Sequence, residues 1–287
     1  MLKSTKKYLV TGATDGIGKA TALRLAEYGY SVVLHGRNED KLNALAFEIE
    51  HCSGNSPSIY VADFSRLSEV ADFAAYLIKK QSDLSVIINN AGLLTDHRQE
   101  STDGYELTFA VNYLAPFLLT NLLLPILQNN KPARVVNVAS SAFGGGCINF
   151  DDLQMTCSFD GWQAYANSKL ANVLFSNHLA EQLGDSSVVS NSCCPGLIDT
   201  NFFHTNTVFA NGAYERMKSG MRPPEQGADI PFYMATSNET AAANGRFYLR
   251  RRDLALGDEI CSVPLNWDRD TAKKLWSETE LMLETWF

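Results

Sequence analysis

The feature that most constrains this chain is a regular alternation of short apolar stretches with longer amphipathic segments. The short stretches are typical of buried β-strands, and the longer segments space their apolar residues as helices do. The expected strands are 8–10, 31–35, 58–62, 86–88, 134–138 and 187–192, and the expected helices are 18–27, 39–50, 67–79, 105–127 and one containing Tyr165. This alternation predicts an α/β fold, a doubly wound parallel β-sheet flanked by helices on both faces. Ligands then bind at the edge formed by the carboxyl ends of the strands.

The length and composition fit one domain built on such a sheet. The 287 residues contain 45% hydrophobic residues, and no Pro, Gly and Ser-rich linker divides them. We therefore expect a single domain over residues 1–287. The stretch 201–224 mixes aromatic with polar residues without a clear period, so a substrate lid is expected around 197–225.

Charge and cysteine content exclude several classes of protein. The net charge is −8 and no basic tract stands out, so no nucleic-acid partner is expected. The N-terminal stretch MLKSTKK is charged rather than apolar, which predicts a chain without a membrane anchor. Six cysteines without the spacing of a zinc site indicate reduced thiols, a cytoplasmic location and no metal centre.

A glycine-rich turn follows the first expected strand, in the sequence YLVTGATDGIG. Gly12, Gly16 and Gly18 lie where a chain must turn tightly between a strand and a helix. A helix N-terminus that begins in such a turn offers N–H groups and positive potential to a pyrophosphate. We therefore expect a dinucleotide to contact the turn through Gly12, Thr14, Asp15, Gly16, Ile17 and Gly18.

The end of the second strand discriminates between NAD(H) and NADP(H). An acid there holds the ribose 2′-hydroxyl of NAD, whereas a 2′-phosphate requires a cation. The strand is followed by Gly36, Arg37 and Asn38, and the guanidinium of Arg37 suits a phosphate, so NADP(H) is favoured over NAD(H). The alternative is that Arg37 is an ordinary surface arginine, and the acid at Asp15 does not favour a phosphate.

Two further strand ends are expected to contact the cofactor. Asp63, followed by Phe64, ends the third strand and is placed to accept a hydrogen bond from an adenine amino group. Its alternative role is a helix cap or loop acid, but Ser65 competes for the cap. Asn90, Ala91 and Gly92 end the fourth strand, where small residues let the backbone lie against the cofactor.

Four polar residues from separate elements are expected to meet at the same edge of the sheet. Ser140 follows the fifth strand, Asn112 interrupts a long apolar helix, and Tyr165 and Lys169 lie one helical turn apart. Singly, each has a structural alternative, such as a satisfied core asparagine or a surface pair. The convergence of all four at one edge of the sheet is harder to explain by purely structural roles.

Together these residues resemble the short-chain dehydrogenase/reductase family, whose members have a Rossmann-type fold. The resemblance spans nearly the whole chain and rests on Thr11-Gly12-x3-Gly16-Ile17-Gly18, Asn89-Asn90-Ala91-Gly92, Asn112, Ser140, Tyr165-x3-Lys169 and Pro195-Gly196. The stretches NFDDL, YANSKLANVLF and DTAKKLWSETE are most similar to the retinol dehydrogenase-like branch. Membrane-bound members of that branch begin with an apolar anchor, so we expect a soluble protein whose natural substrate is not retinol.

The resemblance implies a role for each residue of the reacting set. Tyr165 would be the general acid in carbonyl reduction, with Lys169 lowering the pKa of the phenol from its usual value of about 10 and holding the nicotinamide ribose. Ser140 would hydrogen-bond the substrate carbonyl and stabilise developing oxyanion charge. Asn112 would hold a water that connects Lys169 to solvent.

The segment after the sixth strand would complete the site. Pro195 and Gly196 would lie against the cofactor, and Ile198 and Thr200 would cover the nicotinamide amide. Phe202, Phe203 and Phe209 make the expected lid apolar, which favours an apolar substrate; the alternative is a loop that only packs on the core.

The sequence thus predicts an NADP-dependent oxidoreductase that acts on a small-molecule carbonyl or alcohol. One alternative is a non-catalytic NADP(H)-binding sensor or scaffold, although such proteins usually lack the Tyr or the Lys that this chain retains. Another is a related reaction such as epimerisation or dehydration, for which the C-terminal part looks too short. The apolar helices that begin near 105 and 164 suit a homodimer or homotetramer, unless the C-terminal tail covers them and leaves a monomer.

Overall fold

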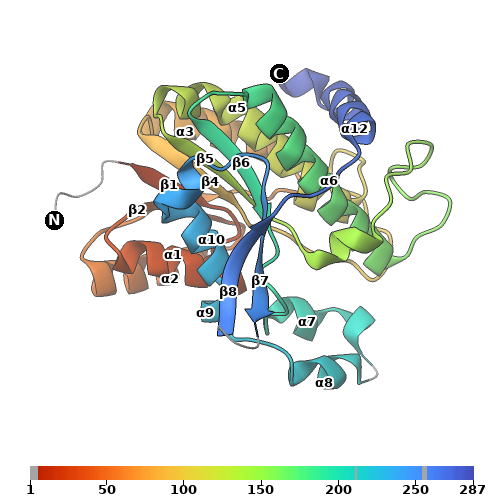
Figure 1. Cartoon of the computed structure of the whole chain (residues 1–287), viewed down its shortest axis with the longest axis horizontal. Helices are drawn as coiled ribbons and strands as arrows, with labels where there is room; N and C mark the ends of the chain where they lie inside the picture. Colours follow the sequence, from red (N-terminus) through yellow and green to blue (C-terminus); the bar gives the residue numbers. More distant parts are fainter. Residues whose placement is uncertain (1–5, 211, 254–256) are drawn as a thin grey trace.

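The computed structural model describes residues 6–210, 212–253 and 257–287, and it confirms the predicted α/β fold (Figure 1). Eight strands of the described chain form one sheet in the order β3-β2-β1-β4-β5-β6-β7-β8. Neighbours from β3 to β7 pair in parallel, and β8 runs antiparallel to β7. The strands are β1 (Lys7–Val10), β2 (Ser31–Gly36), β3 (Ser58–Val61), β4 (Leu84–Asn89), β5 (Ala133–Val138), β6 (Val188–Cys193), β7 (Phe247–Asp253) and β8 (Gly257–Val263). The first six strands have the order of a doubly wound nucleotide-binding sheet.

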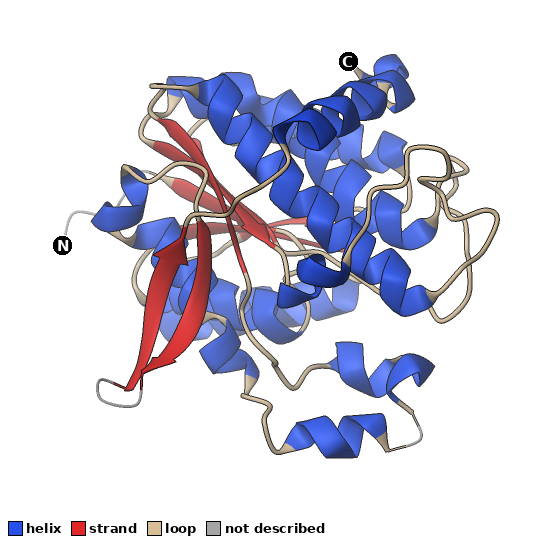
Figure 2. Ribbon diagram, turned by 45° about the vertical axis from the view of Figure 1, so that its right-hand side comes forward, coloured by secondary structure: helices blue, strands red, loops and turns tan. Residues whose placement is uncertain are grey.

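Helices cover both faces of this sheet (Figures 1 and 2). On one face lie α1 (Gly16–Glu27), α2 (Glu39–Ser53) and α10 (Asp229–Thr236), and on the other α3 (Leu67–Lys80), α5 (Ala115–Asn129) and α6 (Gly161–Leu183), with α12 (Arg269–Met282) packed on α6. The shorter helices are α4 (Leu107–Phe109), α7 (Asn201–Thr205), α8 (Ala213–Lys218), α9 (Pro224–Gly227) and α11 (Asn238–Ala241).

The two faces of the sheet carry separate cores. Side chains alternate along a strand, so Leu9 of β1 packs into the core under α3, α5 and α6, while Tyr8 and Val10 pack into the core under α1, α2 and α10. Both cores are dense in aliphatic and aromatic side chains. The strand ends between them are thereby held rigidly, and loops at the carboxyl edge carry the polar residues.

The hairpin of β7 and β8 and the helix α12 are absent from the sequence prediction. β7 reads FYLRRRD and β8 reads GDEICSV, so charged residues interrupt the apolar pattern in both strands. These strands extend the sheet at its edge, where one strand has a neighbour on a single side. An edge strand needs fewer apolar residues than a central one, and the pattern is correspondingly weak.

Helix α12 covers the outer surface of α5 and α6. The Trp276 ring lies 4.7 Å from the Phe117 ring and 5.8 Å from the Phe175 ring, centre to centre. The hydroxyls of Thr279 and Tyr113 are hydrogen bonded at 2.8 Å. The apolar face that suggested a homodimer or homotetramer is therefore packed within the chain, as the alternative of a covering C-terminal tail predicted.

The long apolar helix expected over 105–127 begins at Leu107 and is not uniform. Near its start, Ala110–Leu114 form a π-helical segment between α4 and α5. The stretch Leu107–Asn129 is long and apolar enough to cross a bilayer by length and composition, but 72% of its most apolar window is buried inside the fold. Within the described chain it serves as a core helix.

Candidate active site

The glycine turn needs glycine for two different reasons. Gly12 and Gly16 have φ angles of 63° and 50°, in the left-handed region that favours glycine. At Gly18 the constraint is space, because an added Cβ would lie 2.2 Å from the Gly12 carbonyl oxygen and 2.4 Å from Nδ2 of Asn90. At these three glycines the turn therefore carries backbone without a side chain, beside the start of α1.

Asp15, predicted as a cofactor contact, also has a structural role as a helix cap and as a hydrogen-bond acceptor for the lid. Its Oδ1 accepts the Gly16 N–H at 2.8 Å and caps α1, and its Oδ2 accepts a hydrogen bond from Asn201 Nδ2 at 2.6 Å. Asn201 begins α7 in the expected lid. Asp15 thus connects the glycine turn to the lid, although it also lines the cavity.

Thr11, which the sequence motif included without a role, and His35, which the prediction missed, hold the turn in place. Thr11 Oγ1 accepts the N–H groups of Asn90 and Ala91, both at 3.0 Å, and Asn90 Nδ2 donates to the Thr11 carbonyl at 2.9 Å. His35 Nδ1 accepts the Gly12 N–H at 3.4 Å. The Asn90 side chain therefore binds the turn. The one sequence signal for this is that Asn90 ends β4, the strand that pairs with β1.

His35 is buried and uncharged in the fold. Its ring stacks on Phe64 with centres 4.0 Å apart, and its Nε2 is hydrogen bonded to the Ala62 carbonyl at 3.1 Å. Burial lowers the pKa of His35 to about 4. Phe64, predicted to contact the cofactor, lies in this stack and contributes part of the cavity wall.

The ends of β2 and β3 provide the cations and the acid predicted for the adenosine end. Arg37 is exposed and lines the cavity, and so does Lys41 of α2, which the prediction missed. Asn38 also lines it, but its side chain caps α2 by accepting the Lys41 N–H at 2.9 Å. Lys41 lies in the first turn of α2, just after Arg37 in the sequence, and both cations line the same cavity.

Asp63 is less free than predicted. Its Oδ1 accepts the Ser65 N–H at 3.0 Å, so the carboxylate stabilises the loop before α3. The sequence had instead predicted Ser65 as the cap of that helix. Helix α3 begins at Leu67, whose N–H is accepted by Asp103 at 2.9 Å, and Ser65 does not cap it. Asp63 nevertheless lines the cavity, where its carboxylate can accept a further hydrogen bond.

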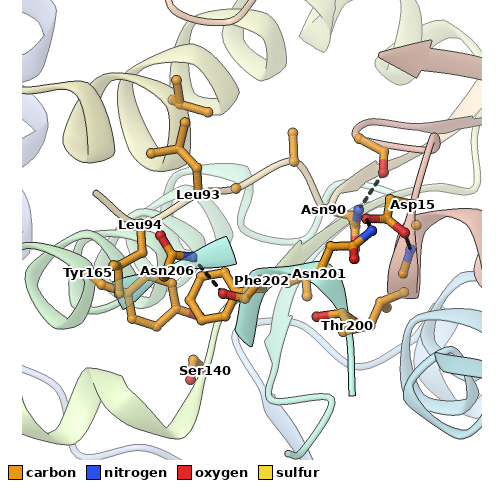
Figure 3. Close-up of a pocket in the computed structure, with 18 of the residues that line it drawn as sticks. Asp15, Asn90, Leu93, Leu94, Ser140, Tyr165, Thr200, Asn201, Phe202 and Asn206 are labelled. Carbon is orange, nitrogen blue, oxygen red and sulfur yellow. Dashed lines mark hydrogen bonds between the residues drawn. The ribbon is translucent and has the colours of Figure 1, made fainter. Parts of the chain in front are cut away.

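Ser140 and Tyr165 lie at the other end of the cavity (Figure 3), and Lys169 lines the same cavity. Lys169 Nζ donates to the Val138 carbonyl at 3.0 Å, at the end of β5, and lies 5.4 Å from the centre of the Tyr165 ring. The Ser140 side chain lies close enough to the Tyr165 phenol to act on its pKa. The fold thus brings together three of the four predicted catalytic groups.

Burial dominates the ionisation of this group. It lowers the pKa of Lys169 to about 8, against an opposing effect of the neighbouring thiols of Cys193 and Cys194. It also raises the pKa of Tyr165, although the hydrogen bond from Ser140 acts to lower it. Burial therefore sets the direction of the Tyr165 pKa in this fold, and the expectation that Lys169 lowers that pKa stays a prediction.

Asn112 lies directly behind the cavity, in the π-helical segment. Its Oδ1 accepts the Leu93 N–H at 2.8 Å, and its Nδ2 donates to the Leu93 carbonyl at 2.9 Å and to Ser168 Oγ at 3.0 Å. A Cβ at Gly92 would lie 3.3 Å from Asn112 Oδ1 and 3.5 Å from Lys169 Nζ. Gly92 therefore leaves open the space between the amide and the ammonium. π-Helical segments often mark functional sites.

The segment after β6 lies across the glycine turn and the reacting group. Pro195, Gly196, Ile198 and Thr200 line the cavity, and a Cβ on Gly16 would lie 2.8 Å from the Thr200 methyl. The Phe202 ring lies 5.0 Å from the Tyr165 ring, centre to centre (Figure 3). The expected lid is therefore in contact with the predicted proton donor.

One cavity of about 1280 Å³ joins all these positions. Every predicted site residue except Asn112 lines it: Gly12, Thr14, Asp15, Gly16, Ile17, Gly18, Arg37, Asn38, Asp63, Phe64, Asn90, Ala91, Gly92, Ser140, Tyr165, Lys169, Pro195, Gly196, Ile198 and Thr200. Its volume exceeds that of an ordinary small-ligand pocket, as a dinucleotide plus a substrate requires. The bare glycine turn, the helix N-terminus and the two cations all fit a phosphorylated dinucleotide.

Comparison with known proteins agrees with this geometry. The sequence profile of the family described as short chain dehydrogenase matches residues 6–209. Human retinol dehydrogenase 14 is 32% identical over 295 residues, which cover 97% of this chain and 86% of that protein. Human polyprenol dehydrogenase is 31% identical over 280 residues, which cover 94% of this chain and 83% of that protein.

Solved structures are similar over most of the chain. A crystal structure of an uncharacterised protein from Mycobacterium paratuberculosis has 29% identity and a TM-score of 0.75, covering 97% of this chain and 93% of that one. A short chain dehydrogenase from Escherichia coli CFT073, complexed with NADPH, has 25% identity and a TM-score of 0.69, covering 85% and 95% of the two chains.

Proposed function

The chain belongs to the short-chain dehydrogenase family, on the branch of the retinol dehydrogenases, and we propose that it transfers hydride between NADP(H) and an apolar carbonyl compound or alcohol. As a member of this family it is an NAD(P)-dependent oxidoreductase. The preference for NADP(H), the apolar substrate and the roles of individual residues are the proposed part. A soluble, cytoplasmic protein without a membrane anchor stays a prediction from the sequence.

The observation that carries the proposal is the continuity of the large cavity. It runs from the cations Arg37 and Lys41, past the glycine turn, to Ser140, Tyr165 and Lys169. A dinucleotide held by the turn would therefore place its two ends near two different kinds of side chain. One end meets cations and the other meets a proton donor.

The cofactor would be held mainly by backbone and by the two ends of the cavity. The N–H groups at the start of α1 suit the pyrophosphate, and Asp63 suits the adenine amino group. Lys169 would donate to the nicotinamide ribose, and Ile198 and Thr200 would cover the ring's amide. When bound, the reduced nicotinamide supplies the hydride.

The side chains supply the proton and the electrostatic stabilisation. In the reducing direction the Tyr165 hydroxyl would donate its proton to the carbonyl oxygen, and the Ser140 hydroxyl would donate a hydrogen bond to the same oxygen. Lys169, with its pKa near 8, is mostly protonated at neutral pH and would favour the phenolate that forms. Asn112 and Lys169 face the same space beside Gly92, which supports a water-mediated proton path between them.

The preference for NADP(H) is supported by charge at the end of β2. The strand ends in His35 and Gly36 rather than in an acid, and Arg37 and Lys41 line the cavity beyond it. Two cations suit a 2′-phosphate, whereas a ribose 2′-hydroxyl needs an acceptor. The NADPH complex of the related bacterial dehydrogenase is consistent with this preference.

An apolar substrate is supported by the walls around Tyr165. Phe202, Phe203, Phe209, Trp162 and Leu94 line this end of the cavity. Aromatic side chains bury large apolar areas and favour apolar ligands. The names of the related retinol and polyprenol dehydrogenases point in the same direction.

Oxidation of NADPH and of NADH in parallel, over a panel of aldehydes, ketones and quinones, tests the proposal. We expect turnover with apolar carbonyls, a preference for NADPH, and loss of turnover in Tyr165→Phe, which removes only the proton donor. Tyr28→Phe is the matched control, since Tyr28 is 70% exposed and lies outside the cavity. Equal rates in Tyr165→Phe and the wild type would refute the mechanism.

A further inference from the structure

The lid segment Asn201–Phe209 is tied at both ends to loops at the carboxyl edge of the sheet. At its start, Asn201 Nδ2 donates to Asp15 in the glycine turn at 2.6 Å (Figure 3). Near its end, Thr207 and Val208 donate to Asp96, in the loop that follows β4. Both attachments are made by the carboxylate of an aspartate.

Asp96 makes three of these hydrogen bonds. Its Oδ2 accepts the Thr207 N–H at 3.0 Å and the Thr207 hydroxyl at 2.6 Å, and its Oδ1 accepts the Val208 N–H at 3.1 Å. The bonds to Thr207 hold the pKa of the Asp96 carboxyl below its usual value. A carboxylate that accepts three hydrogen bonds is a strong anchor for a short exposed segment.

The anchored segment carries the aromatic rings that contact the reacting group. Phe209 lies 6.1 Å from the Trp162 ring and 5.7 Å from the Phe202 ring, centre to centre. Phe202 in turn lies 5.0 Å from the Tyr165 ring. Fixing Val208 therefore fixes Phe209 and, through these ring contacts, the wall that Phe202 forms beside Tyr165.

We propose that Asp96 is a positioning residue for the reaction, which holds the lid so that Phe202 packs on Tyr165 and closes the apolar wall of the substrate site. This inference rests on the proposed function, because it assigns Asp96 a role at the proton donor. The Asp96 carboxylate accepts its hydrogen bonds from Thr207 and Val208 of the lid and not from the Tyr165 phenol or the Lys169 ammonium. Asp96 acts through the lid, and the negative charge of its carboxylate is what makes it a strong acceptor for the lid's hydrogen bonds.

The chain contains a matched control for Asp96. Asp152 accepts the Thr156 N–H at 2.7 Å, the Thr156 hydroxyl at 2.9 Å and the Cys157 N–H at 3.0 Å. The pattern of acceptors and donors is the same, but the Asp152 bonds close a local loop that is separate from the lid. Asp96→Asn and Asp152→Asn thus remove the same kind of anchor at two places.

Amide hydrogen exchange followed by mass spectrometry tests the anchor directly. In Asp96→Asn we expect exchange over residues 206–209 to become faster, while Asp152→Asn changes exchange only over its own loop. Asp96→Glu keeps the carboxylate and should restore part of the protection. Unchanged exchange over 206–209 in Asp96→Asn would overturn the proposal, and this readout does not depend on turnover.

Steady-state kinetics test the consequence for the reaction. We expect kcat/KM for an apolar carbonyl to fall about tenfold in Asp96→Asn, mainly through KM, as suits the loss of hydrogen bonds to a charged acceptor. The Kd of NADPH and the kinetics of Asp152→Asn should be unchanged. Faster exchange with unaltered kinetics would overturn the positioning role. Absence of turnover in the wild type would instead refute the proposed function, and exchange would still decide whether Asp96 anchors the lid.

Discussion

The ammonium group of Lys169 lies over the Tyr165 ring, 5.4 Å from its centre, while it donates to the Val138 carbonyl at 3.0 Å. A cation one helical turn from a tyrosine is therefore not a surface pair here, because both groups face the cavity. The end of β5 fixes the position of the charge. The phenol and the ammonium are thus held together by a strand and a helix rather than by a mobile loop.

The pH dependence of activity should report Lys169. Burial lowers its pKa to about 8, so its charge is present below that pH and is lost as the pH rises through it. Burial raises the pKa of Tyr165, so the proton donor keeps its proton over the same range. We expect kcat/KM for reduction, which reports groups of the free enzyme, to decline above about pH 8. In Lys169→Arg the decline should move to higher pH; a decline at the same pH would assign it to another group.

Stability should depend on pH through His35. Its pKa of about 4 in the fold lies below the value of about 6.5 in the unfolded chain, so the unfolded chain binds more protons between these values. The stabilisation is fully present above about pH 6.5 and is lost as the pH falls towards 4, by about 3 kcal/mol. Urea unfolding at several pH values measures this slope. His35→Gln should reduce it, while the exposed His51→Gln should leave it intact.

Cofactor binding should be sensitive to a single methyl group at Gly18. Gly18→Ala places a Cβ 2.2 Å from the Gly12 carbonyl oxygen, so the turn must shift. We expect NADPH to bind about a hundredfold more weakly, since displacements of this size are costly at a rigid site. Gly144→Ala is the control, because its Cβ would meet no atom within 4 Å. Equal affinities in the two variants, by fluorescence titration, would exclude the turn from cofactor binding.

The preference between the two cofactors should reside in the cations after β2. Arg37→Ala should raise KM for NADPH about tenfold to a hundredfold and leave KM for NADH nearly unchanged, because only the 2′-phosphate accepts charged hydrogen bonds there. Lys41→Ala should act in the same direction. Arg66→Ala, an exposed arginine outside the cavity, is the control. Equal losses with both cofactors would show that Arg37 serves the fold and not the phosphate.

The packing of α12 predicts both a stability effect and an assembly state. Trp276 is 6% exposed, and Trp276→Ala should destabilise the chain by about 3–5 kcal/mol, which chemical unfolding would measure. Because α12 covers α5 and α6, we expect a monomer in sedimentation experiments. A dimer that persists in the wild type would require a different face.

The sequence predicted the elements whose patterns are strong and local. The strands β1 to β6, the glycine turn and the residues at the strand ends were all found, because most of these strands are buried and apolar and the ligand residues follow them. β7, β8 and α12 were missed because their pattern is mixed with charge. The hydrogen bond from Asn201 to Asp15 and the anchor of the lid at Asp96 join residues that are distant in sequence. No local pattern contains that information.

The bonds among Thr11, His35 and Asn90 have a consequence for the thermodynamics of binding. They fix the glycine turn through the fold's own hydrogen bonds, at 3.0 Å from Thr11 Oγ1 to two successive amides and 3.4 Å from Gly12 to His35. The cradle is therefore preorganised before a dinucleotide arrives. Less conformational entropy is lost when the ligand binds, and more of the contact energy remains as affinity.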